Sequence, residues 1–167
     1  MALIVEDGTG LEDAESYLSV SEANDYHSRR GNSAWDDLDD PAKESALIKA
    51  TEYLDNSYSW RGVLSSTTQA LNWPRTNVFD SQGRDLSNSV PQRVKNATAE
   101  LALVSISSEL LANVNNSNYV KREKVEGLEV EYSSSAPSTT QYLYVDRLLG
   151  DLVSSKFGGS TVKLERV

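Results

Sequence analysis

The sequence predicts a mainly α fold: a small helical bundle around a long central helix, with a β-hairpin and extended terminal arms. Three patterns predict it. Apolar residues recur at helical spacing from Val90 to Val114 and from Pro41 to Ser57, and between Tyr119 and Tyr132 the period changes to two, as in a half-buried strand. At 167 residues the chain fits one domain, which we expect to span residues 1–167.

The central helix is expected to open at Val90-Pro91, because proline is favoured in the first turn of a helix. Its core face is predicted to hold Val94, Ala97, Leu101, Val104 and Leu111, widened by Leu103, Ile106 and Leu110. Glu100 and Glu109 interrupt the most apolar stretch, which therefore predicts a buried helix and no contact with a membrane.

Three further helices flank it. Ser19-Val20-Ser21-Glu22 has capping-box spacing and predicts a helix from Val20 to Arg30, followed by an acidic loop with Trp35. Asp40-Pro41, an N-cap with proline after it, predicts a helix to about Ser57. Its core face is predicted to consist of Leu47, Ala50, Tyr53, Leu54 and Tyr58. The last helix is expected from Tyr142 to Val153.

The remaining segments are irregular or extended. Met1 to Val5 is expected as a short strand or an extended arm. Residues 119–132 are predicted to form a β-hairpin, with Glu126-Gly127 at its turn. Phe157-Gly158-Gly159 is predicted to release a C-terminal arm, residues 157–167, in which Val162 and Leu164 keep the two-residue period of a strand and Val167 falls out of phase.

The net charge of -9 is unevenly distributed. Residues 1–60 hold 14 acidic and 4 basic residues, a balance of -10, whereas residues 61–167 hold 11 and 12, a balance of +1. A surface built from the first part would repel phosphate. The chain has no cysteine, which excludes thiolate catalysis and zinc–thiolate sites.

No catalytic, cofactor-binding or metal-binding residue is predicted, and the chain is not expected to be an enzyme. His27 is the only histidine, and Asp25 lies two residues away, a spacing at which helical side chains do not face each other. The acidic run Asp36 to Asp40 lacks the spacing of a calcium loop, since Leu38 breaks the alternation. Acids before a helix are expected from capping alone.

Two groups of residues are candidates for partner contacts. Lys121, Arg122 and Lys124, with Tyr132 nearby, form the only basic cluster, but the glutamates of the same hairpin predict cross-strand ion pairs. The segment Trp60–Ser89 is a long excursion without periodicity. Its Trp60 and Trp73 must cover apolar surface, and Arg61 and Arg75 are predicted to pair with the acidic first third, in the same subunit or a neighbour.

The chain resembles the tailed-phage head completion proteins of the head–tail connector (adaptor) class, a family often labelled DnaT-like single-stranded-DNA-binding proteins. The resemblance covers nearly the whole chain through an ordered series of motifs. The series comprises Met1 to Gly10, Ala14 to Tyr17, Tyr26-His27, Arg30-Gly31-Asn32, Trp35, Ala50 to Asp55, Trp60-Arg61-Gly62, Trp73-Pro74-Arg75, Val90-Pro91, Ala99 to Ala102, Val120 to Val125 and Val130-Glu131-Tyr132.

This resemblance implies a virion protein at the head–tail junction, made in the host cytoplasm. It would form a twelve-fold ring of neighbouring copies under the portal protein, extend the channel for genomic double-stranded DNA, and provide a platform for the next neck or tail protein. The expected docking segment is the arm with Phe157, Val162, Leu164 and Val167. The alternative is a single-stranded-DNA-binding replication accessory protein, which would need a continuous basic groove.

Overall fold

The computed structural model describes residues 3–111, 122–125, 128–131 and 142–156 of the chain. Helices predominate, which confirms the mainly α class. In chain order the elements are α1 (Val20–Ser28), α2 (Ser33–Asp36), α3 (Asp40–Ser57), β1 (Tyr58–Trp60), β2 (Val63–Leu64), β3 (Arg75–Thr76), α4 (Gln92–Ser105), β4 (Arg122–Val125), β5 (Leu128–Glu131), α5 (Leu143–Leu149) and β6 (Val153–Lys156).

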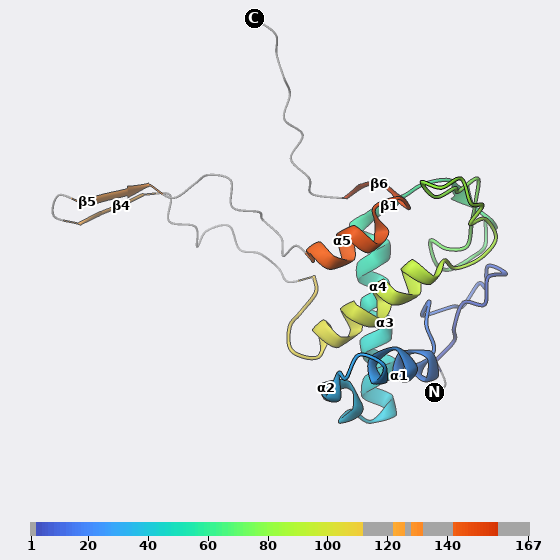
Figure 1. The fold of residues 1–167 in the computed structure, drawn as a ribbon, viewed down its shortest axis with the longest axis horizontal. Coiled ribbons are helices and arrows are strands. Elements are labelled where there is room, and N and C mark those ends of the chain that lie inside the picture. Colours follow the sequence, from blue (N-terminus) through green and yellow to red (C-terminus); the bar gives the residue numbers. More distant parts are fainter. Residues whose placement is uncertain (1–2, 112–121, 126–127, 132–141, 157–167) are drawn as a thin grey trace, which may run out of the picture.

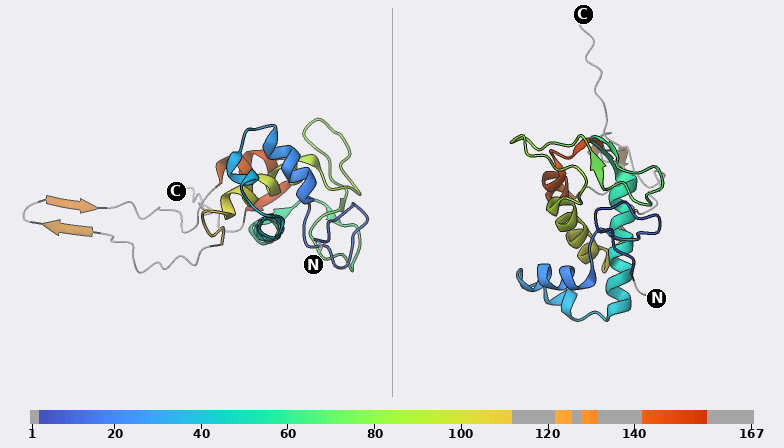
Figure 2. Two further views of the ribbon diagram at one scale, coloured as in Figure 1. Left: turned by 90° about the horizontal axis from the view of Figure 1, so that it is seen from below. Right: turned by 90° about the vertical axis from the view of Figure 1, so that its right-hand side faces the viewer.

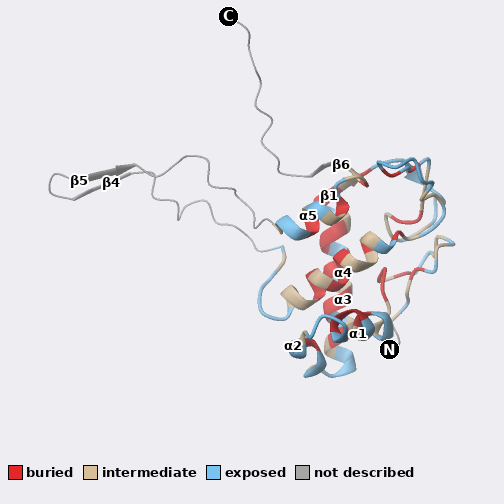
Figure 3. Cartoon of the chain, in the orientation of Figure 1, coloured by how far each residue is buried: buried red, intermediate tan, exposed pale blue. Residues whose placement is uncertain are grey.

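The longest of the described helices is α3, which has 18 residues, whereas α4 has 14. α4 packs across α3, while α1 and α2 lie where α3 begins and the β1–β6 pair lies where it ends (Figures 1 and 2). Buried residues concentrate along α3 and the facing side of α4 (Figure 3). The central position predicted for the helix after Pro91 therefore belongs to α3.

α4 ends at Ser105, well before the predicted end at Val114. The hydroxyls of Ser105, Ser107 and Ser108 donate hydrogen bonds to the carbonyls of the preceding turn. Such bonds compete with the helical ladder, because they satisfy carbonyls that the next turn would otherwise use. Ile106 and Leu111, predicted on the core face, are consequently 40% and 56% exposed.

The helix starts follow the sequence closely. The predicted capping box is confirmed: the Ser19 hydroxyl accepts a bond from the Glu22 N–H, and the Glu22 carboxylate accepts one from the Ser19 N–H. The N-cap of α3 is Asp39, one residue before the predicted Asp40. The segment between these helices, expected as an acidic loop, contains the short helix α2. Its Trp35 is fully buried, and this helical turn therefore packs against the rest of the domain.

The predicted last helix is also shorter than expected. α5 ends at Leu149, and β6 follows it and pairs antiparallel with β1. Tyr58, predicted to end the core face of the second long helix, is buried but begins β1. Strands of three or four residues are too short for a periodic pattern to indicate.

The N-terminal segment is tied to its own subunit. Val5 forms one parallel bridge with Ser16 and no strand. The Glu6 N–H donates to the Ser16 carbonyl at 2.9 Å, and the Glu15 N–H donates to the Ile4 carbonyl at 2.8 Å. The part of this arm that the structure describes is thus no free docking segment, whereas the C-terminal arm, 157–167, lies outside the described residues.

Candidate functional site

The two tryptophans of the Trp60–Ser89 excursion lie in the core. Trp73 is fully buried and Trp60 is 7% exposed. Their rings meet edge to face with centroids 5.8 Å apart, and the Tyr58 ring lies 6.0 Å from Trp60. Buried aromatic rings of this size supply much of the packing in a small domain. These two rings therefore anchor the excursion and do not form an exposed platform for bases.

The two arginines bind main-chain carbonyls instead of the predicted acidic partners. Arg75 donates to the carbonyls of Arg61, Gly62 and Asn72 at 2.7, 2.9 and 3.1 Å. Arg61 donates to the Val153 carbonyl at 3.2 Å. Neither guanidinium forms an ion pair with another described residue. The planar, five-donor guanidinium of Arg75 suits this role, because it holds two stretches of the excursion together at once.

A second network fixes the excursion to α3. Asp55 accepts hydrogen bonds from the Tyr17 hydroxyl and from the Asn72 N–H, the latter at 3.0 Å. The Tyr17 oxygen in turn accepts one from the Trp73 N–H at 3.2 Å. Burial, and then the nearby Asp55 charge, raise the pKa of the Tyr17 hydroxyl well above its ordinary value. Burial also raises the pKa of Asp55. Sequence reasoning missed this network, and residues 38 positions apart leave no periodic signal.

The anchored excursion presents apolar side chains to solvent. Val63, Leu64 and Phe79 are 56%, 43% and 54% exposed, and we call these three residues the loop patch. β2 pairs with β3, and a Cβ at Gly62 would lie 2.2 Å from the Thr76 carbonyl oxygen, so the two stretches approach closely. Because the backbone beneath the loop patch is clamped, a partner could bury it with little loss of conformational entropy.

The predicted hairpin is confirmed in its paired part. β4 and β5 are antiparallel, with Arg122 opposite Glu131 and Lys124 opposite Glu129. This register places residues of opposite charge at facing positions, as the sequence analysis expected. Lys121 and Tyr132 lie outside the described residues, as do Phe157, Val162, Leu164 and Val167.

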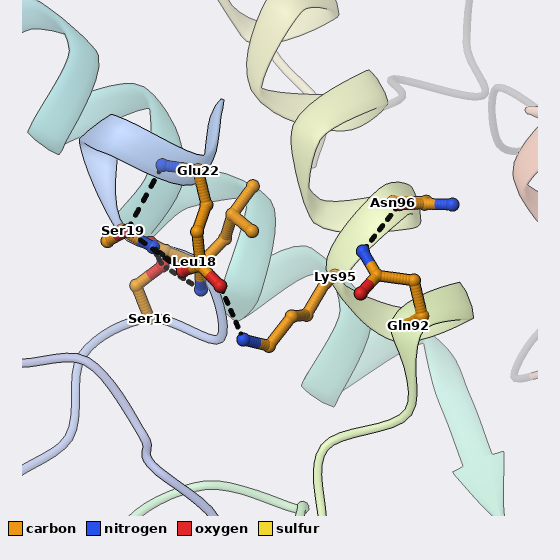
Figure 4. A network of polar contacts seen from close by, with 7 residues as sticks. All are labelled: Ser16, Leu18, Ser19, Glu22, Gln92, Lys95 and Asn96. Atoms are coloured by element: carbon orange, nitrogen blue, oxygen red, sulfur yellow. Dashed lines mark hydrogen bonds and ion pairs between the residues drawn. The ribbon is translucent and has the colours of Figure 1, made fainter. Parts of the chain in front are cut away.

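Four cations elsewhere among the described residues have acidic partners. Four ion pairs are formed: Arg30–Glu100 at 3.9 Å, Arg84–Asp80 at 2.7 Å, Arg93–Asp151 at 3.0 Å and Lys95–Glu22 at 2.7 Å. Figure 4 shows Lys95 of α4 reaching the same Glu22 that closes the capping box of α1. Lys43 is buried, with its ammonium 5.9 Å from the centre of the Trp35 ring. These four ion pairs reduce the positive charge that the described residues could present to phosphate.

His27 is fully buried between the rings of Tyr26 and Trp35. Its ring lies 4.6 Å from that of Trp35, and the Asn32 amide nitrogen is 3.0 Å from its Nδ1. Burial lowers the pKa of His27, while the charge of Glu100 on α4 opposes the change. Among the described residues, no cluster of acidic and histidine side chains has an arrangement that could hold a metal ion.

The buried His27 predicts a pH-dependent stability. Because its folded pKa lies below the ordinary value of about 6.5, the unfolded chain takes up the proton more readily. The contribution of neutral His27 to the free energy of unfolding should be complete above about pH 6.5. It should decline as the pH falls toward the lowered pKa of His27 in the folded protein. Thermal unfolding of the protein and of a His27→Gln variant at several pH values between about 7.5 and 5.5 tests this. Equal slopes for the two proteins would contradict it.

A family model with the description "Putative DnaT-like ssDNA binding protein" matches residues 1–167 of the chain. The chain belongs to this family. No curated protein and no solved structure matches it. None of the described helices combines the length and apolar character that a bilayer crossing needs.

The structure gives several of the motifs quoted in the sequence analysis a physical role. Tyr17, Asp55, Trp60, Trp73 and Arg75 come from four separate motifs and meet around one end of α3. All of them hold the excursion in place. In this chain these four motifs therefore serve packing and loop anchoring.

Proposed function

We propose that this protein is a structural subunit of the head–tail junction of a tailed phage. In this proposal it is an adaptor that docks under the portal protein, forms a ring of twelve copies, extends the DNA channel and provides the platform for the next neck or tail protein. It is made in the host cytoplasm, acts in the virion, and has no enzymatic activity, cofactor or membrane contact.

The observation that carries the proposal is the acidic charge balance of the first part of the chain. Acidic residues outnumber basic ones by 14 to 4 in residues 1–60, and the described cations Arg30, Arg84, Arg93 and Lys95 are paired with acidic residues. A subunit that lines a channel must let genomic DNA pass without retention, and an acidic or neutral wall does so. The exposed loop patch supports a role in protein contacts.

Co-sedimentation with portal-containing capsids tests the proposal. The full chain should sediment with these capsids and remain in solution with capsids that lack the portal. A chain without residues 159–167 should stay folded by circular dichroism and no longer sediment, because we assign the docking contact to the C-terminal arm. Failure of the full chain to bind any portal-containing particle would contradict the adaptor role.

The second candidate is an ssDNA-binding replication accessory protein, which the description of the DnaT-like family favours. The adaptor proposal predicts weak DNA binding, with a Kd of about 10⁻⁴–10⁻⁶ M or weaker at physiological salt, as for non-specific contacts. Fluorescence anisotropy with a labelled oligonucleotide measures it. Submicromolar affinity with a steep decrease at higher salt would support the second candidate instead.

A further inference from the structure

A second exposed apolar surface lies where α4 ends and α5 begins. Ile106 and Leu111 are 40% and 56% exposed, and Leu143 and Tyr144 are 64% and 54% exposed. α5 packs against α4, and the Ser108 hydroxyl lies close enough to Tyr142 to affect the pKa of its phenol, so the start of α5 lies near the turn after α4. We call these four exposed residues the helix-end patch.

The loop patch and the helix-end patch lie at opposite ends of α4. The excursion leads into this helix, and the turn with Ile106 follows it. At 1.5 Å per residue, a helix of 14 residues separates its ends by about 21 Å. Figures 1 and 2 show the excursion and the far end of α4 on opposite sides of the body.

The surroundings of the two patches have complementary charge. The excursion from residue 61 to residue 89 contains Arg61, Arg75 and Arg84 against two aspartates. A groove beside the helix-end patch is lined by Glu52 and Glu109 against Lys49. Each patch would therefore meet unfavourable charge in a second copy of itself and favourable charge in the other patch.

We propose that the loop patch of one subunit packs against the helix-end patch of the next copy of this chain. Contacts between two different patches are heterologous and repeat from subunit to subunit, closing into a ring when the rotation allows. This inference rests on the ring in the proposed function and names the surfaces that form it. The clamped backbone of the loop patch favours it, because little order has to be imposed on association.

The absence of cysteine from the chain permits a direct test. A Leu64→Cys chain and a size-tagged Leu111→Cys chain are mixed and treated with a short bismaleimide. We expect the product that joins the two different chains to exceed either like-with-like product by roughly tenfold or more, because docking raises the effective concentration of the two thiols. A Phe79→Ser substitution in the Leu64→Cys chain should remove this preference.

An Asp37→Cys chain is the matched control, since Asp37 is exposed and belongs to neither patch. The yields of its cross-linked products with the Leu64→Cys and Leu111→Cys chains should be those expected from random collision. A random mixture from the two patch variants, or a preference for like chains, would overturn the inference. Slow reaction of Leu111→Cys with a monofunctional maleimide would also overturn it, because the chain itself would then cover the helix-end patch. Loss of cross-linking with normal co-sedimentation would reject these surfaces and leave the adaptor role intact.

Discussion

A Trp73→Ala variant should lose about 3–5 kcal/mol of the free energy of unfolding, the range for truncating a large buried aromatic side chain. Trp73 is fully buried, packs edge to face on Trp60, and belongs to a core that includes Tyr58. Its indole nitrogen has no hydrogen-bond partner among the described residues, so the loss comes from packing and from the cavity left behind.

Urea unfolding followed by circular dichroism measures this loss, and Phe79→Ala is the matched control. Phe79 is an aromatic residue of the same excursion but is 54% exposed, so its truncation should change stability by about 0.5 kcal/mol or less. Similar losses for the two variants would mean that the excursion is not anchored through its tryptophan. Trp73→Ala should also weaken the contact between the loop patch and the helix-end patch, because the excursion that carries the loop patch is anchored through Trp73.

The sequence predicts the described long helices because each combines a periodic apolar face with a recognisable start. Ser19 and Glu22 determine the start of α1, and the acidic residues before Pro41 determine that of α3 to within one residue. The helix ends were less predictable. α4 stops where Ser105, Ser107 and Ser108 bond back to its carbonyls, a competition that depends on side-chain geometry and not on apolar spacing.

The roles of the excursion residues depend on distant partners. The burial of Trp60 and Trp73 could be predicted from the sequence, because large aromatic rings in a loop are expected to pack on apolar surface. The sequence contains no sign, however, that Arg75 binds carbonyls or that Asp55 accepts from Tyr17. The acidic first third of the chain suggested ion pairs for Arg61 and Arg75. In the structure, main-chain carbonyls accept hydrogen bonds from both guanidinium groups, and neither forms an ion pair with a described acid.

Glu6 is another residue whose role the sequence analysis missed, and it leads to the second large expected effect. It is 1% exposed, and its carboxylate accepts hydrogen bonds from the N–H groups of Gly8, Gly10 and Leu11 at 2.8, 2.9 and 2.9 Å. Gly8 and Gly10 have positive φ, which turns successive N–H groups toward the carboxylate. An acid followed by closely spaced glycines was the available signal.

A Glu6→Ala variant should lose about 3–5 kcal/mol of the free energy of unfolding, because bonds to a charged acceptor are strong and three donors are left without it. Glu6→Gln keeps one acceptor oxygen and should lose about half as much. Glu12→Gln removes the same charge from an exposed position and should change stability by about 0.5 kcal/mol or less.

Chemical denaturation of the three variants under one set of conditions gives the comparison. The Leu11 carbonyl accepts a bond from the Ala70 N–H at 2.8 Å, so the loop that Glu6 organises also supports the excursion. Glu6→Ala should therefore increase hydrogen exchange at Ala70 as well as within residues 8–11, whereas Glu12→Gln should leave both unchanged. If Glu6→Ala is no less stable than Glu12→Gln, the loop does not depend on its buried carboxylate, and the main-chain hydrogen bonds of the N-terminal segment are enough to hold it.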